Sequence, residues 1–319
     1  MHTTAVLLEQ PQQLRLAEVP LAEPTDADVV VDVEWSGIST GTERLLYTGR
    51  MPAFPGMGYP LVPGYESVGR VVSAGAASGH ALGQRVFVPG ANCYGSLDGQ
   101  PVRGLFGGAA ARVVVPGRRV IPVDEALGEQ AVLLALAATA YHAVACGGTV
   151  DHPRPPQLII GHGVLGRLLA RLNVAAGCTD TVVWETNPAR ADGAQGYQVL
   201  NPADDPRRDY TVVCDVSGDA HILDTLIGRL AFGGEIILAG FYDRLAFNFA
   251  PAFMREARIR TAAEWQRPDL LAVQQLMQGG LLSLDGLITH HSACTQATPA
   301  YATAFGDVAC LKMVLDWRH

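Results

Sequence analysis

The stretch Leu158-Ile-Ile-Gly161-His-Gly163-Val-Leu-Gly166 decides the fold of this 319-residue chain. An apolar run of this kind predicts a buried strand, and three glycines follow it at the spacing Gly-x-Gly-x-x-Gly. The first glycine allows a tight turn, the second lets backbone N–H groups approach a pyrophosphate, and the third lets the next helix pack closely on the sheet. The amino terminus of that helix adds partial positive charge. The pattern predicts a dinucleotide site at Gly161, Gly163, Val164, Leu165 and Gly166.

The surrounding residues support this prediction. Residues 157–160 are typical of a strand, 164–175 of an amphipathic helix, and 181–184 of a second strand. Glu185 ends that strand about 20 residues beyond the glycines, where a carboxylate can hydrogen-bond an adenosine ribose. Because a carboxylate there repels the extra phosphate of NADP, the expected cofactor is NAD. Arg190 is either a second ribose contact or an ordinary solvated arginine at a helix start.

The composition indicates a compact, soluble protein with enough chain for two domains. Hydrophobic residues make up 49% and charged residues 17%, and the formal net charge of -8 argues against a nucleic-acid partner. The six cysteines form no Cys-x-x-Cys pair, which favours a reducing, cytoplasmic location over a disulfide framework. The amino terminus lacks the pattern of a signal peptide, and the apolar run 131–145 is too short for a membrane span. We expect that run to be a buried helix.

The organisation of the chain predicts an α/β protein. Short strands between proline and glycine turns fill the first part, at 5–8, 14–16, 29–35, 67–73 and 85–88. From about residue 125, helical and strand patterns alternate, beginning with a helix over 128–145, which predicts a doubly wound parallel sheet. Its ligand is expected at the carboxyl ends of the strands, where Ser217 and Gly240 lie. The final strands, at 287–291 and 311–316, are expected to return to the first lobe.

This organisation resembles the medium-chain dehydrogenase/reductase superfamily. Three segments carry the resemblance, Trp35–Thr42, Pro63–Val71 and Ala135–Tyr141, and the third includes Thr139, a candidate cofactor contact. The resemblance implies a β-rich, GroES-like catalytic lobe at 1–124, completed by 264–319. It implies a Rossmann NAD-binding domain at 125–263. Homodimers are common in the superfamily, so a homodimer is one state open to the chain.

The usual catalytic zinc of the superfamily is not expected here. The positions that usually supply its ligands hold Ser39, Tyr65 and Ala135. Zinc sites need thiolate, imidazole or carboxylate donors, and only Glu66 remains as a fourth partner. The structural-zinc loop is also missing, because the segment around Cys93 holds a single cysteine. The predicted metal content is therefore none.

Without zinc, another group must polarise an alcohol during hydride transfer to NAD. Tyr65 is the first candidate for this contact. Glu66 would orient it or accept the proton, with Ser39 and Thr40 beside them. The alternative for Tyr65 is a bulky filler of the lost metal cavity. His142 could relay a proton, but on an apolar helix a core or interface histidine is the competing interpretation.

The segment 39–69 narrows the resemblance to the dehydrogenases of bacteriochlorophyll biosynthesis. These enzymes oxidise a 3-(1-hydroxyethyl) group to 3-acetyl with NAD, so the resemblance implies a bacteriochlorophyllide-type tetrapyrrole substrate. The uncharged stretch 51–63 would suit either the wall of a flat apolar pocket or ordinary packing between lobes. Glu43 and Arg44 could meet polar edges of a pigment, although charges at a helix start are usually solvated.

Two alternatives stay open. One is a zinc-free quinone or enone reductase of the same superfamily. The other is a non-catalytic protein that binds NAD and a pigment. The cofactor residues are common to all three.

Overall fold

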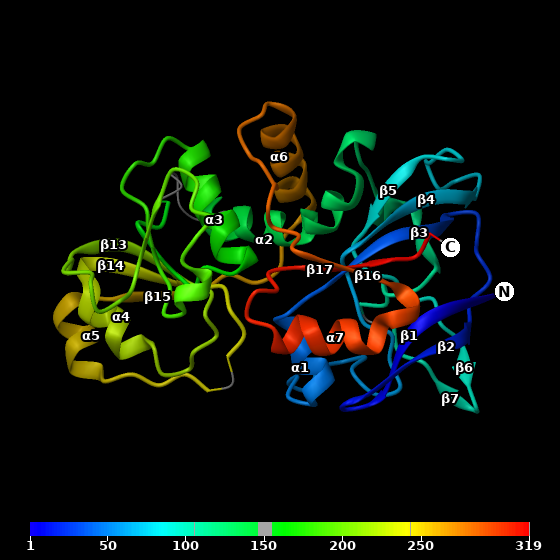
Figure 1. The fold of residues 1–319 in the computed structure, drawn as a ribbon, viewed down its shortest axis with the longest axis horizontal. Helices are drawn as coiled ribbons and strands as arrows, with labels where there is room; N and C mark the ends of the chain where they lie inside the picture. Colours follow the sequence, from blue (N-terminus) through cyan, green and yellow to red (C-terminus); the bar gives the residue numbers. More distant parts are fainter. Residues whose placement is uncertain (105, 146–154, 243, 319) are drawn as a thin grey trace. The chain divides into compact units, whose positions relative to one another are not determined.

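The computed structural model describes residues 1–104, 106–145, 155–242 and 244–318, which form two compact units (Figure 1). Unit 1 comprises Met1–Ala135 and Leu287–His319, and unit 2 comprises Leu136–Gly286. The domain boundaries predicted from the sequence lie at 124/125 and 263/264. The boundaries between the two compact units lie at 135/136 and 286/287.

Unit 1 is built on a seven-stranded sheet with the strand order β16-β17-β3-β4-β5-β9, and β8 pairs with β3. Two strands from the carboxyl-terminal segment extend this sheet. β17 runs antiparallel to β3 with Met313 opposite Ile38, and β16 runs parallel to β17. The strands are β3 (Asp28–Ile38), β4 (Ser67–Ala74), β5 (Arg85–Val88), β8 (Arg112–Pro116), β9 (Ile121–Pro122), β16 (His290–Ala293) and β17 (Met313–Asp316).

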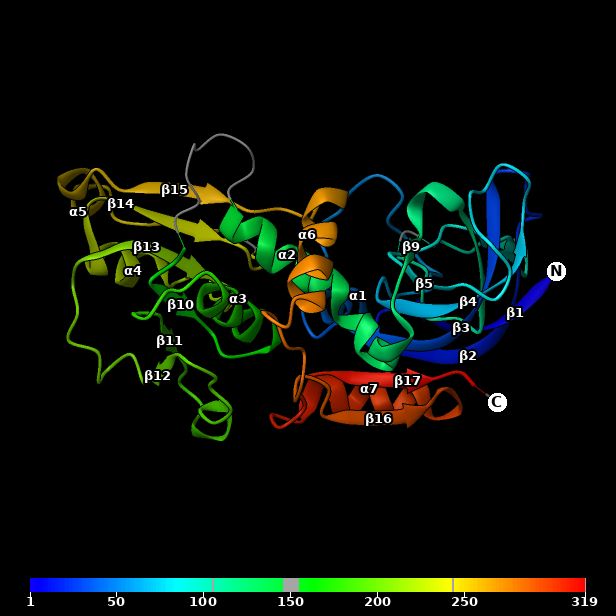
Figure 2. The ribbon, with the colours of Figure 1, turned by 90° about the horizontal axis from the view of Figure 1, so that it is seen from above.

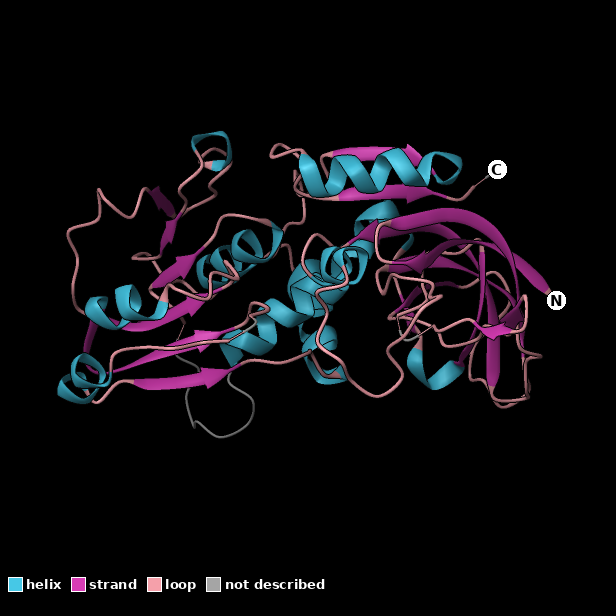
Figure 3. Cartoon of the chain, turned by 90° about the horizontal axis from the view of Figure 1, so that it is seen from below, coloured by secondary structure: helices cyan, strands magenta, loops and turns pink. Residues whose placement is uncertain are grey.

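Smaller elements complete unit 1. β1 and β2 form an antiparallel pair, as do β6 and β7. The helix α7 packs against β16 and β17 and runs along them in Figure 3. The bounds are β1 (His2–Gln10), β2 (Gln13–Pro20), α1 (Thr42–Thr48), β6 (Ser96–Leu97), β7 (Gln100–Pro101) and α7 (Ala297–Gly306).

β3 lies at the centre of unit 1 and is buried along most of its length. Its valines contribute to a core in which Val29 and Val31 are fully buried. β-branched residues suit such a strand because they pack well on a pleated surface. Since β3 is fixed on both edges, the residues that follow Ile38 start from a rigid position.

Unit 2 contains a six-stranded, wholly parallel sheet with the order β12-β11-β10-β13-β14-β15 (Figure 2). The chain moves outward from β10 on one side and then continues from β13 on the other, so the order reverses beside β10. The predicted doubly wound α/β fold is confirmed. The strands are β10 (Leu158–Ile160), β11 (Val182–Trp184), β12 (Gln198–Leu200), β13 (Tyr210–Asp215), β14 (Leu230–Leu238) and β15 (Arg258–Thr261).

Five α-helices are described along with this sheet, and all of their residues lie in unit 2 except the first two of α2. α3 spans Val164–Ala175, as the amphipathic pattern predicted. The others are α2 (Leu134–Ala145), α4 (Leu223–Arg229), α5 (Phe249–Arg255) and α6 (Arg267–Gln278).

Two elements differ from their sequence-based predictions. The helix expected over 128–145 is a 3₁₀ segment, Glu125–Leu133, followed by α2, because Gly128 takes a positive φ of 50° that breaks the helix. The strand expected at 287–291 begins only at His290. The combined stretch Glu125–Ala145 has the length and composition of a membrane span, but 56% of its apolar window is buried within the fold.

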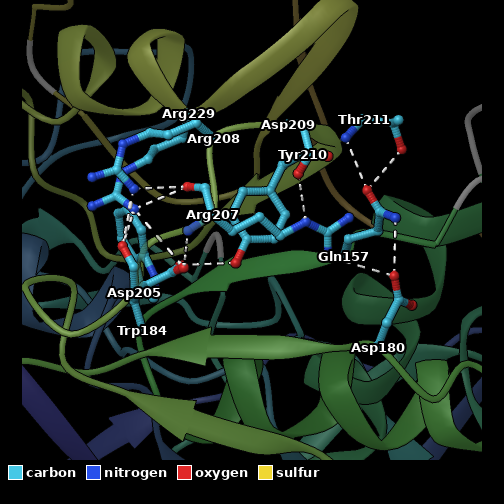
Figure 4. Close-up of polar contacts among 10 residues, drawn as sticks. All are labelled: Gln157, Asp180, Trp184, Asp205, Arg207, Arg208, Asp209, Tyr210, Thr211 and Arg229. Atoms are coloured by element: carbon cyan, nitrogen blue, oxygen red, sulfur yellow. Dashed lines mark hydrogen bonds and ion pairs between the residues drawn. The ribbon is translucent and has the colours of Figure 1, made fainter.

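A buried polar network fixes the end of β11 (Figure 4). Asp205 is 2% exposed and accepts hydrogen bonds from Trp184 Nε1 at 2.7 Å and Tyr210 Oη at 2.8 Å. The Arg229 guanidinium stacks over the Trp184 ring with its carbon 4.7 Å from the ring centroid. The strand that leads into Glu185 is therefore held by directional contacts as well as by packing.

Candidate functional site

The glycine loop of unit 2 has the geometry that a pyrophosphate requires. Gly161 turns off β10 with a φ of 102°, a conformation that L side chains rarely adopt. A Cβ on Gly166 would lie 1.8 Å from the Gly161 carbonyl oxygen, so α3 can pack this closely only with glycine there. A Cβ on Gly163 would meet open space. The loop also follows β10, where the strand order reverses, which is the usual ligand position in such sheets.

Glu185 lies directly beside this loop. Its carboxylate accepts the backbone N–H of His162 at 3.1 Å and that of Asn187 at 2.8 Å. Each carboxylate oxygen can accept more than one hydrogen bond, so capacity remains for ribose hydroxyls. The residues present therefore fit a dinucleotide, with the pyrophosphate at the glycines and the adenosine ribose at Glu185.

His162 is a site residue that the sequence analysis missed. Its ring is buried, with Nδ1 2.6 Å from the Arg190 carbonyl oxygen and Nε2 2.8 Å from Tyr197 Oη. Because a carbonyl oxygen only accepts, Nδ1 carries the hydrogen and Nε2 accepts from the tyrosine. Burial lowers the pKa of His162, which favours this neutral form. Arg167 also donates to the Arg190 carbonyl oxygen, so the backbone at Arg190 is tied to the glycine loop.

Ser217 and Gly240 follow β13 and β14, at the same edge of the sheet as the glycine loop. A Cβ on Gly161 would lie 3.6 Å from Ser217 Cα, and one on Gly240 would lie 3.2 Å from the Gly218 nitrogen. Tyr242 Oη donates to the buried Asp215 carboxylate beneath them at 2.8 Å. The structure thus brings the predicted cofactor residues of three strands together.

Two further candidates lie on α2. Thr139 is half-buried. His142 Nδ1 lies 2.9 Å from Asp269 Oδ2, and the same oxygen accepts the Gln266 N–H in the cap of α6. These contacts agree with the interface interpretation of His142, since they tie α2 to α6.

The second group of candidates lies in unit 1, where β3 ends and β4 begins. Ser39 Oγ and Tyr65 Oη are 2.8 Å apart. Glu66 is fully buried and forms an ion pair with Lys312, with Oε2 and Nζ 2.6 Å apart. A Cβ on Gly37 would lie 2.3 Å from Glu66 Oε2, so this carboxylate needs the glycine of β3 beneath it. Thr40 follows Ser39 and is half-buried.

Glu43 corrects the expectation of a solvated helix-start charge. It is 1% exposed, and its carboxylate accepts the Ser39 N–H at 3.0 Å and the Tyr301 hydroxyl. Burial raises the pKa of Glu43 to about 7, although both hydrogen bonds oppose the rise. Arg44, the next residue, is exposed as expected.

Tyr65 is half-buried and its ring packs against Phe106, with the centroids 5.6 Å apart. Burial raises the pKa of the Tyr65 hydroxyl, the nearby Glu66 raises it further, and the Ser39 hydrogen bond only partly opposes them. Tyr65 is therefore a neutral phenol that can donate or accept a hydrogen bond.

The uncharged stretch 51–63 borders a small, mainly apolar pocket in unit 1. Met57, Leu61, Phe106 and Arg103 are among the residues that line it. Because Phe106 also contacts Tyr65, the pocket and the phenol belong to one region.

The residues of this region do not fit catalytic zinc. Ser39 and Tyr65 are hydrogen-bonded to each other, Ala135 has no donor side chain, and Glu66 already pairs with Lys312. Within the described ranges, no three His, Cys, Asp or Glu side chains are grouped as a metal site would need.

Comparisons with known proteins agree with this architecture. The alcohol dehydrogenase GroES-like domain family matches residues 25–125. The chain is 56% identical over its full length to the 2-desacetyl-2-hydroxyethyl bacteriochlorophyllide A dehydrogenase of Cereibacter sphaeroides, covering 99% of that protein. It is 54% identical over its full length to the protein of the same name from Rhodobacter capsulatus, again covering 99%.

Solved structures with lower sequence identity share the fold. An alcohol dehydrogenase from Escherichia coli CFT073, complexed with NADH, has a TM-score of 0.81 at 22% identity, with 99% of each chain covered. A dehydrogenase from Sinorhizobium meliloti 1021, bound to NADP, has a TM-score of 0.80 at 20% identity, also with 99% of each covered. The chain therefore belongs to the medium-chain dehydrogenase/reductase family that includes the two bacteriochlorophyllide dehydrogenases.

Proposed function

We propose that this chain is a dehydrogenase that oxidises the 3-(1-hydroxyethyl) group of bacteriochlorophyllide a to 3-acetyl, with NAD as acceptor. The observation that carries the proposal is the full-length identity of 56% to a protein named for this hydroxyethyl pigment. The apolar side chains of Met57, Leu61 and Phe106 near Tyr65 are of the kind that could contact a tetrapyrrole face.

A nicotinamide cofactor follows from the fold, and Glu185 supports NAD over NADP. Its carboxylate is fixed by two backbone N–H groups, so it cannot readily move away from a 2′-phosphate. The resulting charge repulsion would weaken NADP binding.

A nicotinamide cofactor held at the glycine loop and Glu185 would supply an acceptor for the hydride of the alcohol carbon. The protein must hold the hydroxyl and remove its proton. Tyr65 is our candidate for the contact with the substrate oxygen, because it is half-buried whereas Glu66 is fully buried. Glu66 would then act through its neighbours, as the fixed negative end of the Lys312 ion pair.

The test is an incubation of the purified protein with NAD and 3-(1-hydroxyethyl) bacteriochlorophyllide a. We expect NADH absorbance to rise while the red band of the pigment shifts. Tyr65→Phe should lower turnover and leave NAD binding largely intact. Treatment with a metal chelator should leave activity unchanged.

Other results would favour the two alternatives. Reduction of quinones with NADH, without pigment oxidation, would favour a quinone reductase. Binding of pigment and NAD without any spectral change would favour a non-catalytic protein. A cytoplasmic location and a homodimer remain predictions, which fractionation and light scattering would test.

A further inference from the structure

Glu43 is a buried acid that the proposed reaction has not yet used. Its carboxylate contacts the Ser39 N–H and the Tyr301 hydroxyl. The geometry points to Glu43 as the residue that takes up the proton of the substrate hydroxyl, received through Tyr65 and Ser39. This inference rests on the proposed function, because it assigns the proton released by that reaction.

The charges around Glu43 leave it able to change its protonation state. Glu66 and Lys312 are at most 1% exposed and neutralise each other in an ion pair. The hydrogen-bonding partners of Glu43 described above, Ser39 and Tyr301, are both neutral. Because an isolated charge is costly in a buried position, such an acid exchanges its proton near neutral pH instead of staying ionised.

The groups that face Glu43 affect its pKa in opposite directions. Burial raises it to about 7, and the negative charge of Glu66 raises it further. Tyr301, Ser39 and Lys312 lower it. A group with a pKa near the working pH is well suited to accept a proton in one step and release it in the next.

The hydroxyl groups provide a short route to this acid. Tyr65 is a neutral phenol, so it can accept the substrate proton only as it passes its own to Ser39 Oγ, 2.8 Å away. The backbone N–H of Ser39 donates to Glu43 Oε1 at 3.0 Å, so the two residues are in contact, and the proposed relay requires the Ser39 hydroxyl to turn from Tyr65 toward this carboxylate.

The transfer balances. The alcohol carbon loses hydrogen with its electron pair to the cofactor, and the alcohol oxygen loses a proton to Tyr65. A carbonyl forms on the substrate, Tyr65 and Ser39 remain neutral, and Glu43 becomes protonated.

Tyr301 allows the inference to be tested independently of Glu43. A hydrogen bond to a carboxylate favours its ionised form, so Tyr301→Phe should raise the pKa of Glu43 further. If Glu43 accepts the proton, the pH dependence of turnover must move upward with it. A purely structural role for Glu43 predicts no such movement.

The experiment compares pigment oxidation with NAD in the wild type, Glu43→Gln, Tyr301→Phe and the control Glu23→Gln. The side chain of Glu23 is 83% exposed. Glu23→Gln therefore removes a carboxylate without changing the hydrogen bonds of Glu43 to Ser39 and Tyr301. We expect wild-type kcat to rise with pH through an inflection at about 7. Glu43→Gln should lose the inflection and lower kcat at least about 100-fold, with KM nearly unchanged. Tyr301→Phe should move the inflection to higher pH.

Circular dichroism and titration with NAD would verify that each variant folds. Wild-type kcat and pH dependence in folded Glu43→Gln would overturn the inference, as would an unmoved inflection in Tyr301→Phe. If Glu43→Gln does not fold, the Tyr301→Phe result decides alone. A wild-type protein that does not oxidise the pigment would instead refute the proposed function.

Discussion

Lys312→Met should strongly destabilise unit 1. The ammonium group is 1% exposed, and Nζ lies 2.6 Å from Glu66 Oε2 and 3.3 Å from the Ile38 carbonyl oxygen. Methionine keeps most of the side-chain volume but leaves the Glu66 carboxylate buried without its cation. The Oε1 atom of Glu66 is buried and has no hydrogen-bond partner among the described residues, so it cannot compensate. Removing one member of a buried ion pair costs about 3–5 kcal/mol.

The assay is urea unfolding at neutral pH, followed by circular dichroism. The double variant Glu66→Gln/Lys312→Met should recover much of the loss, since replacing both members of a buried pair with neutral groups is often tolerated. Glu9 and Arg15 provide an exposed control pair, with side chains 42% and 46% exposed. Glu9→Gln should cost less than about 1 kcal/mol. If Lys312→Met costs no more than that control, or the double variant is worse than the single one, the reasoning is refuted.

Three further outcomes are expected. Glu185→Ala should weaken NAD binding and relax discrimination against NADP, and an unchanged preference in cofactor titrations would contradict its ribose role. Gly163→Val should fold normally by circular dichroism yet lose NAD affinity at least about tenfold, because its side chain would fill the open approach to the loop. Glu43 has a folded-state pKa above its ordinary value, so it contributes stability at low pH that is lost as pH rises from about 4.5 through about 7. The unfolding free energy of Glu43→Gln should therefore fall less over that range than that of the wild type, and equal slopes would contradict the burial effect.

The local fold around the glycine loop could be predicted because its signals are local. A buried strand, three spaced glycines, a helix and Glu185 lie within one short segment, and each has a separate physical reason to be there. The parallel direction of the strands follows from the alternation of helices and strands, since parallel strands need crossovers.

The contacts of the two buried acids of unit 1, Glu43 and Glu66, could not be predicted in the same way. Tyr301 lies 258 positions from Glu43, and Lys312 lies 246 positions from Glu66. No periodicity connects residues so far apart. A charged side chain at the start of a short helix is usually exposed to solvent. The sequence pattern therefore predicted an exposed Glu43, whereas the fold buries this side chain. The 3₁₀ segment was missed because the positive φ of Gly128 kinks the chain within Glu125–Leu133, and a residue pattern does not show a backbone angle.

The burial of Lys312 has a practical consequence for chemical labelling. It is the only lysine of the 319 residues, and its ammonium group is withdrawn from solvent within the folded protein. Acylating reagents should therefore modify this side chain only when unit 1 opens. Mass spectrometry would detect the label at Lys312. The rate of labelling would then measure how often the buried ion pair of Lys312 and Glu66 becomes accessible to water.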